Sequence, residues 1–168
     1  MNIQIRKVTI NDAKQIVDYC NQVAGESDNM SFGVGEFGIT YEQEVEFLKS
    51  IEGSINNFMM VAIANNQIIG LTNISGSSRP RIIHNVDLGI SVKQEYWGLG
   101  VGSKLLDSMI EECQKTGLIR NIHLLVVADN TKAIGLYKKY GFKQVGSYAN
   151  YHFVNEQYKD LLIMEKIL

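Results

Sequence analysis

The sequence predicts a single α/β domain in which helices flank a mixed, largely antiparallel sheet. The chain has 168 residues, which suits one domain, and no linker rich in Pro, Gly or Ser divides it. Segments with strand and helix patterns are mixed without strict alternation, and short turns join two pairs of strands. We therefore treat residues 1–168 as one domain.

The N-terminal third predicts a strand, two helices and a long loop. Ile3–Val8 alternates apolar and polar residues, as a half-buried strand does. Asn11 opens a stretch with apolar residues at helical spacing. Gly25–Gly38 has four glycines and little periodicity, and loops of this length in compact domains are often functional. Thr40–Ile51 predicts a helix, because Thr40 followed by Gln43 has the form of a capping box.

The middle of the chain predicts three strands and a helix. Phe58–Ala64 and Gln67–Ser75 have strand patterns, and an Asn-Asn turn at residues 65 and 66 joins them as a hairpin. Ile82–Val92 predicts a third strand. A glycine-rich turn follows, and Gly102–Lys115 places its apolar residues on one helical face.

The last part predicts three strands around one helix. Ile122–Val127 is almost entirely apolar, as expected for a central strand covered on both faces. Asn130–Tyr140 predicts a helix that ends at Gly141 in a C-terminal cap. Phe142–Tyr151 and Tyr158–Leu168 predict two final strands.

Composition excludes several classes of function. Sixteen basic and 18 acidic residues argue against binding nucleic acid through bulk charge. The longest apolar run, Phe58–Ala64, is far shorter than the roughly 20 residues of a membrane span, and the first ten residues lack the apolar core of a signal peptide. Cys20 and Cys113 cannot form a disulfide framework, so we expect a cytoplasmic protein without membrane or nucleic-acid partners.

The most informative motif is the run Tyr-Trp-Gly-Leu-Gly-Val-Gly-Ser-Lys at residues 96–104. Its glycines, Gly98, Gly100 and Gly102, lie between a predicted strand and a predicted helix. Glycine permits a positive φ and a close approach of ligand to backbone, and the N–H groups at a helix N-terminus bind phosphate. The motif therefore indicates a ligand that carries pyrophosphate. The alternative is a tight turn without a ligand, for which one glycine would suffice.

Two common nucleotide motifs fit this loop poorly. A P-loop ends in Gly-Lys-Ser/Thr, whereas the order here is Gly102-Ser103-Lys104. The dinucleotide fingerprint needs Gly-x-Gly-x-x-Gly and an acidic residue about 20 positions later. The spacing here is Gly-x-Gly-x-Gly, and residues 118–122 contain no acid.

The chain resembles the GNAT superfamily of acyl-CoA-dependent N-acetyltransferases over nearly its whole length. Residues 88–92 followed by 96–106 are similar to the strand and loop that hold pantetheine and pyrophosphate in that family. Residues 130–142 are similar to its second signature, Asn-x-x-Ala-x-x-Leu-Tyr-x-x-x-Gly-Phe. Trp97 stands where the family usually has Arg or Gln. The resemblance implies a GNAT-like fold, acetyl-CoA as cosubstrate and transfer of acetyl to a primary amine.

The resemblance also implies which residues hold CoA. Asn130 would hydrogen-bond the pantetheine arm while capping its helix. The lysines around that helix, Lys132, Lys138, Lys139 and Lys143, suit a solvated face and a position near the CoA phosphates equally well. The expected CoA-binding residues are Ile90, Ser91, Val92, Trp97, Gly98, Gly100, Val101, Gly102, Ser103, Asn130, Ala133, Tyr137 and Lys139.

Tyr137 matches the family tyrosine that protonates the leaving CoA thiolate. Its helical spacing with Ala133, Leu136 and Tyr140 equally suits an aromatic residue of the core. The motif match favours the acid. An amine acceptor must lose a proton before it attacks the thioester, and strand N–H groups near residues 90–92 would stabilise the oxyanion of the tetrahedral intermediate.

The general base has three candidates. Asp87 precedes the Leu-Gly-Ile run of the third strand, where many relatives carry a carboxylate near the acceptor amine. His84 is the alternative side chain, because histidine titrates near neutrality. An ordered chain of water serves in some relatives. Asp87 is our expectation, while a surface role suits either residue equally well.

The acceptor pocket is expected at the loop of residues 27–33 and the helix after it, with Tyr148, Tyr151 and His152 near the last hairpin. The acceptor is a small-molecule amine or a protein N-terminal amine. His123 lies in an apolar strand and is interpreted as a core histidine. The histidines and cysteines lack metal-site spacing, so no metal is expected.

Two other classes of function compete with this interpretation. One is a non-catalytic acyl-CoA-binding sensor or regulatory module, against which both Asn130 and Tyr137 argue. The other is a kinase or dehydrogenase whose glycine loop binds ATP or NAD. Homodimerisation is expected from family analogy alone.

Overall fold

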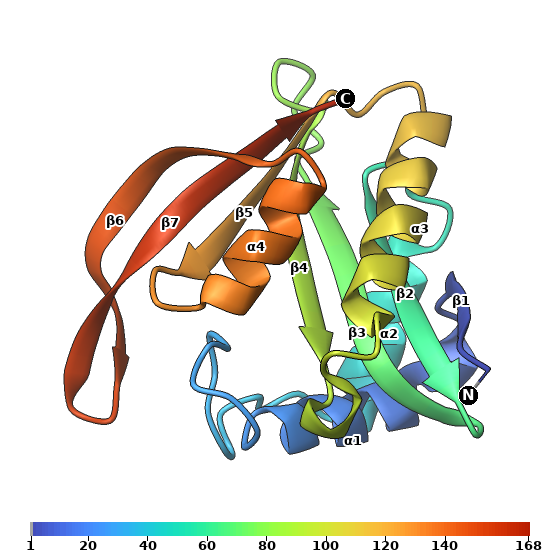
Figure 1. Cartoon of the computed structure of the whole chain (residues 1–168). Helices are drawn as coiled ribbons and strands as arrows, with labels where there is room; N and C mark the ends of the chain where they lie inside the picture. Colours follow the sequence, from blue (N-terminus) through green and yellow to red (C-terminus); the bar gives the residue numbers. More distant parts are fainter. Residues whose placement is uncertain (1) are drawn as a thin grey trace.

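The fold is a seven-stranded mixed sheet with helices on both faces (Figure 1). The computed structural model describes residues 2–168. The strands follow the order β1-β2-β3-β4-β5-β7-β6, and every neighbouring pair is antiparallel except β4 and β5. The predicted α/β class with a largely antiparallel sheet is therefore confirmed.

The strands are β1 (Gln4–Lys7), β2 (Asn57–Ala64), β3 (Gln67–Gly76), β4 (Asn85–Val92), β5 (Asn121–Val127), β6 (Lys143–Val154) and β7 (Gln157–Ile167). The α-helices are α1 (Ala13–Val23), α2 (Tyr41–Ile51), α3 (Val101–Lys115) and α4 (Thr131–Lys139). Short 3₁₀ turns η1 (Ile10–Asp12) and η2 (Gln94–Tyr96) precede α1 and follow β4.

The predicted strand boundaries were wrong at two places. The third strand begins at Asn85 rather than at Ile82, because Ile82 and Asn85 donate their N–H groups to Arg79 and Ile82 in successive turns. β6 extends beyond Tyr151 to Val154. A turn at Asn155 and Glu156, both with positive φ, then leads into β7.

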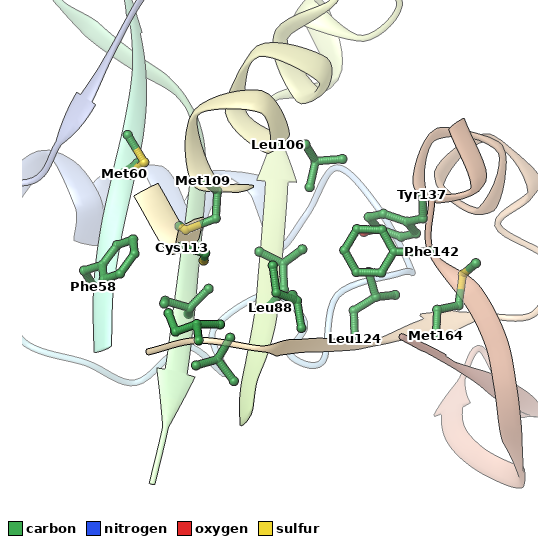
Figure 2. Packing of buried hydrophobic residues seen from close by; sticks show 14 of the residues in the cluster. Phe58, Met60, Leu88, Leu106, Met109, Cys113, Leu124, Tyr137, Phe142 and Met164 are labelled. Atoms are coloured by element: carbon green, nitrogen blue, oxygen red, sulfur yellow. The ribbon is translucent and has the colours of Figure 1, made fainter. Parts of the chain in front are cut away.

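Apolar clusters lie on both faces of the sheet. Met60 and Val61 are neighbours in β2, and because side chains alternate along a strand they enter different cores. On one face, α3 contributes Leu106 and Met109 to the core that also contains Tyr137 of α4 (Figure 2). On the other face, α1 and α2 pack against β2 and β3. No helix within residues 2–168 has the length and apolar character needed to cross a membrane.

The sheet divides between β4 and β5. These strands pair in parallel only over Asn85–Asp87 and Asn121–His123. Beyond that, β4 continues along β3 to Val92, while β5 continues along β7 to Val127. Figure 1 shows the two strands diverging, with α4 in front of the split and the loop after α1 below the wide end of the split. The split leaves one long edge of each strand without a strand neighbour.

Candidate active site

A large cleft of about 1880 Å³ lies in the split between β4 and β5. Its walls come from both strands, the start of α3, the start of α4, the β6–β7 hairpin and the loop after α1. All expected CoA-binding residues except Lys139 line this cleft, as does Asp87. The chain therefore brings together residues that lie up to about 50 positions apart in the sequence.

The edge of β4 supplies free backbone donors to the cleft. Lys93 N–H donates to Ile69 O, and Thr72 Oγ1 donates to Gly89 O, so the backbone groups of residues 89, 91 and 93 face β3. Direction alternates along a strand, so the N–H groups of Leu88, Ile90 and Val92 face away from β3, and that of Leu88 belongs to the last parallel pair with β5 while those of Ile90 and Val92 face the split. Because β5 does not pair there, these donors are open to a ligand.

The N-terminus of α3 lies at the wide end of the cleft. Gly98 and Gly100 have φ of 75° and 79°, a conformation that residues with a Cβ rarely adopt. Gly100 is the N-cap and makes no side-chain capping bond, and the first internal bond of the helix runs from Lys104 N–H to Gly100 O at 3.1 Å. The N–H groups of residues 101–103 are therefore left for an anion.

Gly102 allows α3 and α4 to approach closely. A Cβ at this position would lie 3.2 Å from Leu136 Cδ2. The Tyr140 hydroxyl lies 3.1 Å from Ser103 O and 3.0 Å from Asp107 Oδ2, which ties the end of α4 to α3. The two helices thus form one wall of the cleft.

Trp97 closes the end of β4. Its Nε1 donates to Val92 O at 2.7 Å, while the ring remains 41% exposed. The bond satisfies a carbonyl that faces the split. At this position the indole therefore has a structural contact within the loop as well as a surface on the cleft.

One stripe of α4 faces the cleft. Asn130, Ala133 and Tyr137 follow the i, i+3, i+7 spacing of a helical face and all line the cleft. Asn130 Oδ1 accepts from Ala133 N–H at 3.2 Å, so the predicted cap is present, and its Nδ2 is left as a donor. Lys139 is two residues from Tyr137, about 200° around the helix, and its Nζ lies 5.9 Å from the Tyr140 ring centre.

Tyr137 is buried where α4 meets the core. Its ring packs against Phe142 with centroids 5.8 Å apart, and Figure 2 shows the two rings together beside Leu124. Burial raises the pKa of the Tyr137 phenol to about 12. The hydroxyl therefore keeps its proton throughout the neutral range, as a group that must donate a proton requires.

Ser91 is held on the opposite face of the sheet. Its Oγ lies 2.9 Å from the hydroxyl of Tyr19 in α1, and burial raises the pKa of that phenol. Odd-numbered side chains of β4 therefore face α1. Tyr137 and α1 therefore lie on opposite faces of the sheet at the split.

The loop after α1 crosses the cleft from β4 to the β6–β7 hairpin. Glu26 Oε2 accepts from Gln94 N–H at 2.6 Å at one end. At the other end, Asn155 Nδ2 donates to Asp28 Oδ2 at 2.8 Å, and His152 Nε2 lies 3.0 Å from Asp28 O. Tyr148 and Tyr151 stack beside it with ring centroids 5.1 Å apart. Residues 26–31, which we call the strap, enclose the expected acceptor pocket.

A row of polar side chains crosses the narrow end of the cleft. Asp87 of β4 lies opposite His123 of β5, and His123 lies opposite Glu165 of β7. His123 Nε2 lies 3.0 Å from Glu165 Oε2, and all three residues line the cleft. From the sequence we interpreted His123 as a core histidine. Its contact with Glu165, 42 positions later, could not be predicted because it depends on the register of β5 and β7.

His84 lies outside the cleft. It belongs to the turn before β4, and its carbonyl accepts from the N–H groups of Arg120 and Asn121. Within residues 2–168, no group of three or more His, Cys, Asp and Glu side chains is arranged to hold a metal ion.

The sequence model of the acetyltransferase (GNAT) family matches residues 28–142, more than half of the chain. This chain belongs to the GNAT acetyltransferase family. The resemblance seen in the sequence motifs is therefore confirmed. The cleft, the α3 N-terminus and the α4 stripe all lie within or beside the matched segment.

Among curated relatives, the chain is 36% identical over 108 residues to the L-amino acid N-acetyltransferase AaaT of Escherichia coli strain K12, covering 64% of this chain and 67% of that protein. It is 26% identical over 156 residues to an N-alpha-acetyltransferase of Sulfolobus acidocaldarius, covering 90% and 86%. Its relatives thus include one named as an L-amino acid N-acetyltransferase and one named as an N-alpha-acetyltransferase.

Solved structures agree over the whole chain. A GNAT-family acetyltransferase from Streptococcus pneumoniae has a TM-score of 0.97 at 33% identity, covering 99% of this chain and 100% of that one. The yncA protein of Salmonella typhimurium, solved with its cofactor acetyl-CoA, has a TM-score of 0.86 at 18% identity, covering 100% and 95%. The second likeness concerns the fold alone.

Proposed function

We propose that this GNAT protein transfers acetyl from acetyl-CoA to a primary amine by direct attack, through a tetrahedral intermediate. The observation that carries the proposal is the convergence on one cleft of the open N–H edge of β4, the uncapped start of α3 and the Tyr137 hydroxyl. Each feature suits a different part of the thioester substrate.

The pantetheine arm suits the edge of β4. Its amides can pair with Ile90 and Val92 as a neighbouring strand would, and Asn130 Nδ2 offers a further donor from α4. The pyrophosphate suits the free N–H groups of Val101, Gly102 and Ser103 at the start of α3. This arrangement directs the acetyl group toward the narrow end of the split.

Tyr137 protonates the thiolate in this proposal. A thiolate with an ordinary pKa near 8.5 leaves more readily when a proton is delivered to it. The phenol is protonated at neutral pH and lines the cleft from the α4 side. An N–H group of the β4 edge stabilises the oxyanion, and Asp87 or water accepts the amine proton.

The acceptor enters from the side of the strap. This side carries Glu26, Asp28 and the stacked Tyr148 and Tyr151. A small-molecule amine or a protein N-terminal amine fits this opening, and the relatives include enzymes named for each class. We expect the protein to act in the cytoplasm without a metal.

A thermal-shift experiment with acetyl-CoA, CoA, ATP and NADH tests the donor. At 100 times its Kd, a ligand that binds only the native state adds about 2.7 kcal/mol, which raises the Tm of a chain this size by about 5–10 °C. We expect the two CoA species alone to produce that rise. Acceptor-dependent thiol release over an amine panel then separates an enzyme from a non-catalytic acyl-CoA sensor, which would bind but release no thiol.

A further inference from the structure

We propose that His123, oriented by Glu165, is the base that accepts the proton of the acceptor amine. The inference deepens the proposed function and rests on it. His123, which we interpreted from the sequence as a core residue, would then take the role for which Asp87 and water were the candidates. Three observations carry it: the strand register, the His123–Glu165 contact and the face of the sheet on which both residues lie.

The register places the three polar residues on one face. Residues directly opposite each other on paired strands point to the same side of the sheet, so Asp87, His123 and Glu165 form a row. Ser91 has the same parity as Asp87 in β4 and contacts Tyr19 of α1. The row therefore lies on the face of the sheet that α1 covers, at the narrow end of the cleft whose wide end the strap crosses.

Tyr137 lies on the other side of the split. It belongs to the same apolar cluster as Leu88 and Leu124, whose side chains alternate with those of the polar row. The thioester carbonyl between β4 and β5 thus has the phenol on one face and the polar row on the other. This is the arrangement required when the amine arrives on one face and the acid serves the leaving group from the other.

The contact with Glu165 defines the His123 tautomer. An ionised carboxylate only accepts hydrogen bonds, so Nε2, 3.0 Å from Glu165 Oε2, carries the ring proton. Nδ1 then has a free lone pair. Among the hydrogen bonds within residues 2–168, the ring makes only the one to Glu165. Glu165 thereby holds the ring as a base and stabilises the imidazolium that forms.

His123 suits the proton transfer better than a neighbouring carboxylate. An ordinary imidazole has a pKa near 6.5, against about 4 for an ordinary carboxyl group, and is the stronger base toward an ammonium of pKa about 8–10. The imidazole is also 30% exposed, so it reaches the cleft while its Nε2 is engaged. Asp87 then serves to attract the cationic amine.

Charged groups from the surrounding elements also face this row. Lys143 of β6 lies opposite Glu165, and the strap brings Glu26 and Asp28 to the same cleft. Lys159 is held by Asp129 at 2.8 Å farther along the cleft. Acidic groups therefore outnumber free basic groups along this cleft, which favours a cationic acceptor.

The reaction balances with these residues. The ammonium gives one proton to His123 Nδ1, and the freed lone pair forms the N–C bond at the thioester carbonyl. The carbonyl electron pair moves to oxygen and returns as the C–S bond breaks, and the thiolate takes the proton of Tyr137. The second amine proton returns through solvent to the phenolate, and His123 releases its proton to solvent.

The test compares pH profiles of kcat/KM for wild type, His123→Gln and Glu165→Gln. The probes are free L-amino acids and a peptide with a free N-terminal alanine, assayed by thiol release. Gln at 123 can still donate to Glu165 but has no basic nitrogen. We expect His123→Gln to lower kcat/KM at pH 7 about 100-fold, to remove the acid-side limb and to leave KM for acetyl-CoA within about twofold.

Glu165→Gln and a matched histidine control complete the set. Gln at 165 keeps a hydrogen bond but loses the charge, so we expect about a 10-fold loss of kcat/KM. His84→Gln removes a histidine outside the cleft and should retain the wild-type rate and profile. A wild-type profile in His123→Gln overturns the base assignment and leaves the proposed function standing. Absence of thiol release by wild type with every probe overturns both.

The ring tautomer provides a readout that does not depend on activity. Nitrogen-15 NMR of the histidine rings in the full-length protein should show His123 as the Nε2–H tautomer. Glu165→Gln should weaken that preference. A neutral His123 ring protonated at Nδ1 would leave no lone pair toward the acceptor and would contradict the proposal.

Discussion

At the scale of single residues, position within the helix or strand period decides which side chains share the site. Tyr137 and Lys139 belong to the same sequence motif, yet only Tyr137 lines the cleft, because two residues of an α-helix correspond to about 200° of rotation. Asn130 was predictable both as a cap and as a member of the motif. His123 was not, because its significance depends on Glu165 in another strand.

Tyr137→Phe removes the phenolic hydroxyl, which is the proposed proton donor, and keeps the aromatic ring. The ring keeps its contact with Phe142, so we expect the Tm to change by less than about 2 °C. Without the phenolic proton, kcat should fall about 100-fold or more, while the Kd for acetyl-CoA stays within about twofold. Steady-state kinetics and calorimetric titration measure the two quantities. An unchanged rate across pH would exclude the acid role.

Glu44 predicts a pH dependence of stability outside the cleft. The side chain is buried in α2, its Oε1 has no hydrogen-bond partner within the described chain, and burial raises its pKa. The native state therefore holds the proton more tightly than the unfolded state. This contribution to stability is complete below the unfolded pKa and is lost as pH rises through the native pKa.

Glu44→Gln removes this dependence. The Tm of the variant relative to wild type should rise between pH 4 and pH 8, because only the wild type must bury a carboxylate at the higher pH. Glu42→Gln, on an exposed position of the same helix, is the control and should show no such trend. A constant difference for Glu44→Gln would contradict the burial argument.

At the scale of elements, the loop into α3 combines a conformational requirement with an anion site. Gly100→Ala places a Cβ at φ 79°, so we expect a loss of about 1–2 kcal/mol in unfolding free energy and weaker binding of acetyl-CoA. Gly135→Ala is the matched control. It lies within α4 with nothing within 4 Å of the added Cβ, and should stabilise the protein by about 0.5–1 kcal/mol.

The strap predicts a selective effect on the acceptor. Asn155→Ala removes the bond from the β6–β7 hairpin to Asp28 without touching the CoA side of the cleft. We expect faster hydrogen exchange in residues 24–40 and a KM for the amine raised about threefold or more, with an unchanged KM for acetyl-CoA. Equal changes in both KM values would show that the strap does not act on the acceptor alone.

Element boundaries show what local sequence can predict. The capping box at Thr40 was predictable and is present, with Thr40 N–H donating to Gln43 Oε1 at 2.9 Å. The apolar run from Ile82 suggested a strand, but turn bonds from Ile82 and Asn85 delay its start. Hydrophobic pattern alone does not distinguish an extended residue from one in a tight turn before a strand.

At the scale of the whole molecule, the function depends on where the sheet divides. The two signature motifs indicated the family and most of the CoA side of the cleft. They could not show that β4 and β5 separate after three residue pairs, because that follows from pairing with different neighbours, β3 and β7. Homodimerisation stays a prediction, which light scattering of the purified protein tests.

A crystal structure with acetyl-CoA bound would show whether the split between β4 and β5 holds this ligand. We expect pantetheine amides to pair with Ile90 and Val92 and the pyrophosphate to lie on the N–H groups of residues 101–103. The thioester sulfur should lie within hydrogen-bond reach of the Tyr137 hydroxyl. Acetyl-CoA bound elsewhere would rule out the split as the cosubstrate site, and a sulfur remote from Tyr137 would rule out Tyr137 as the acid.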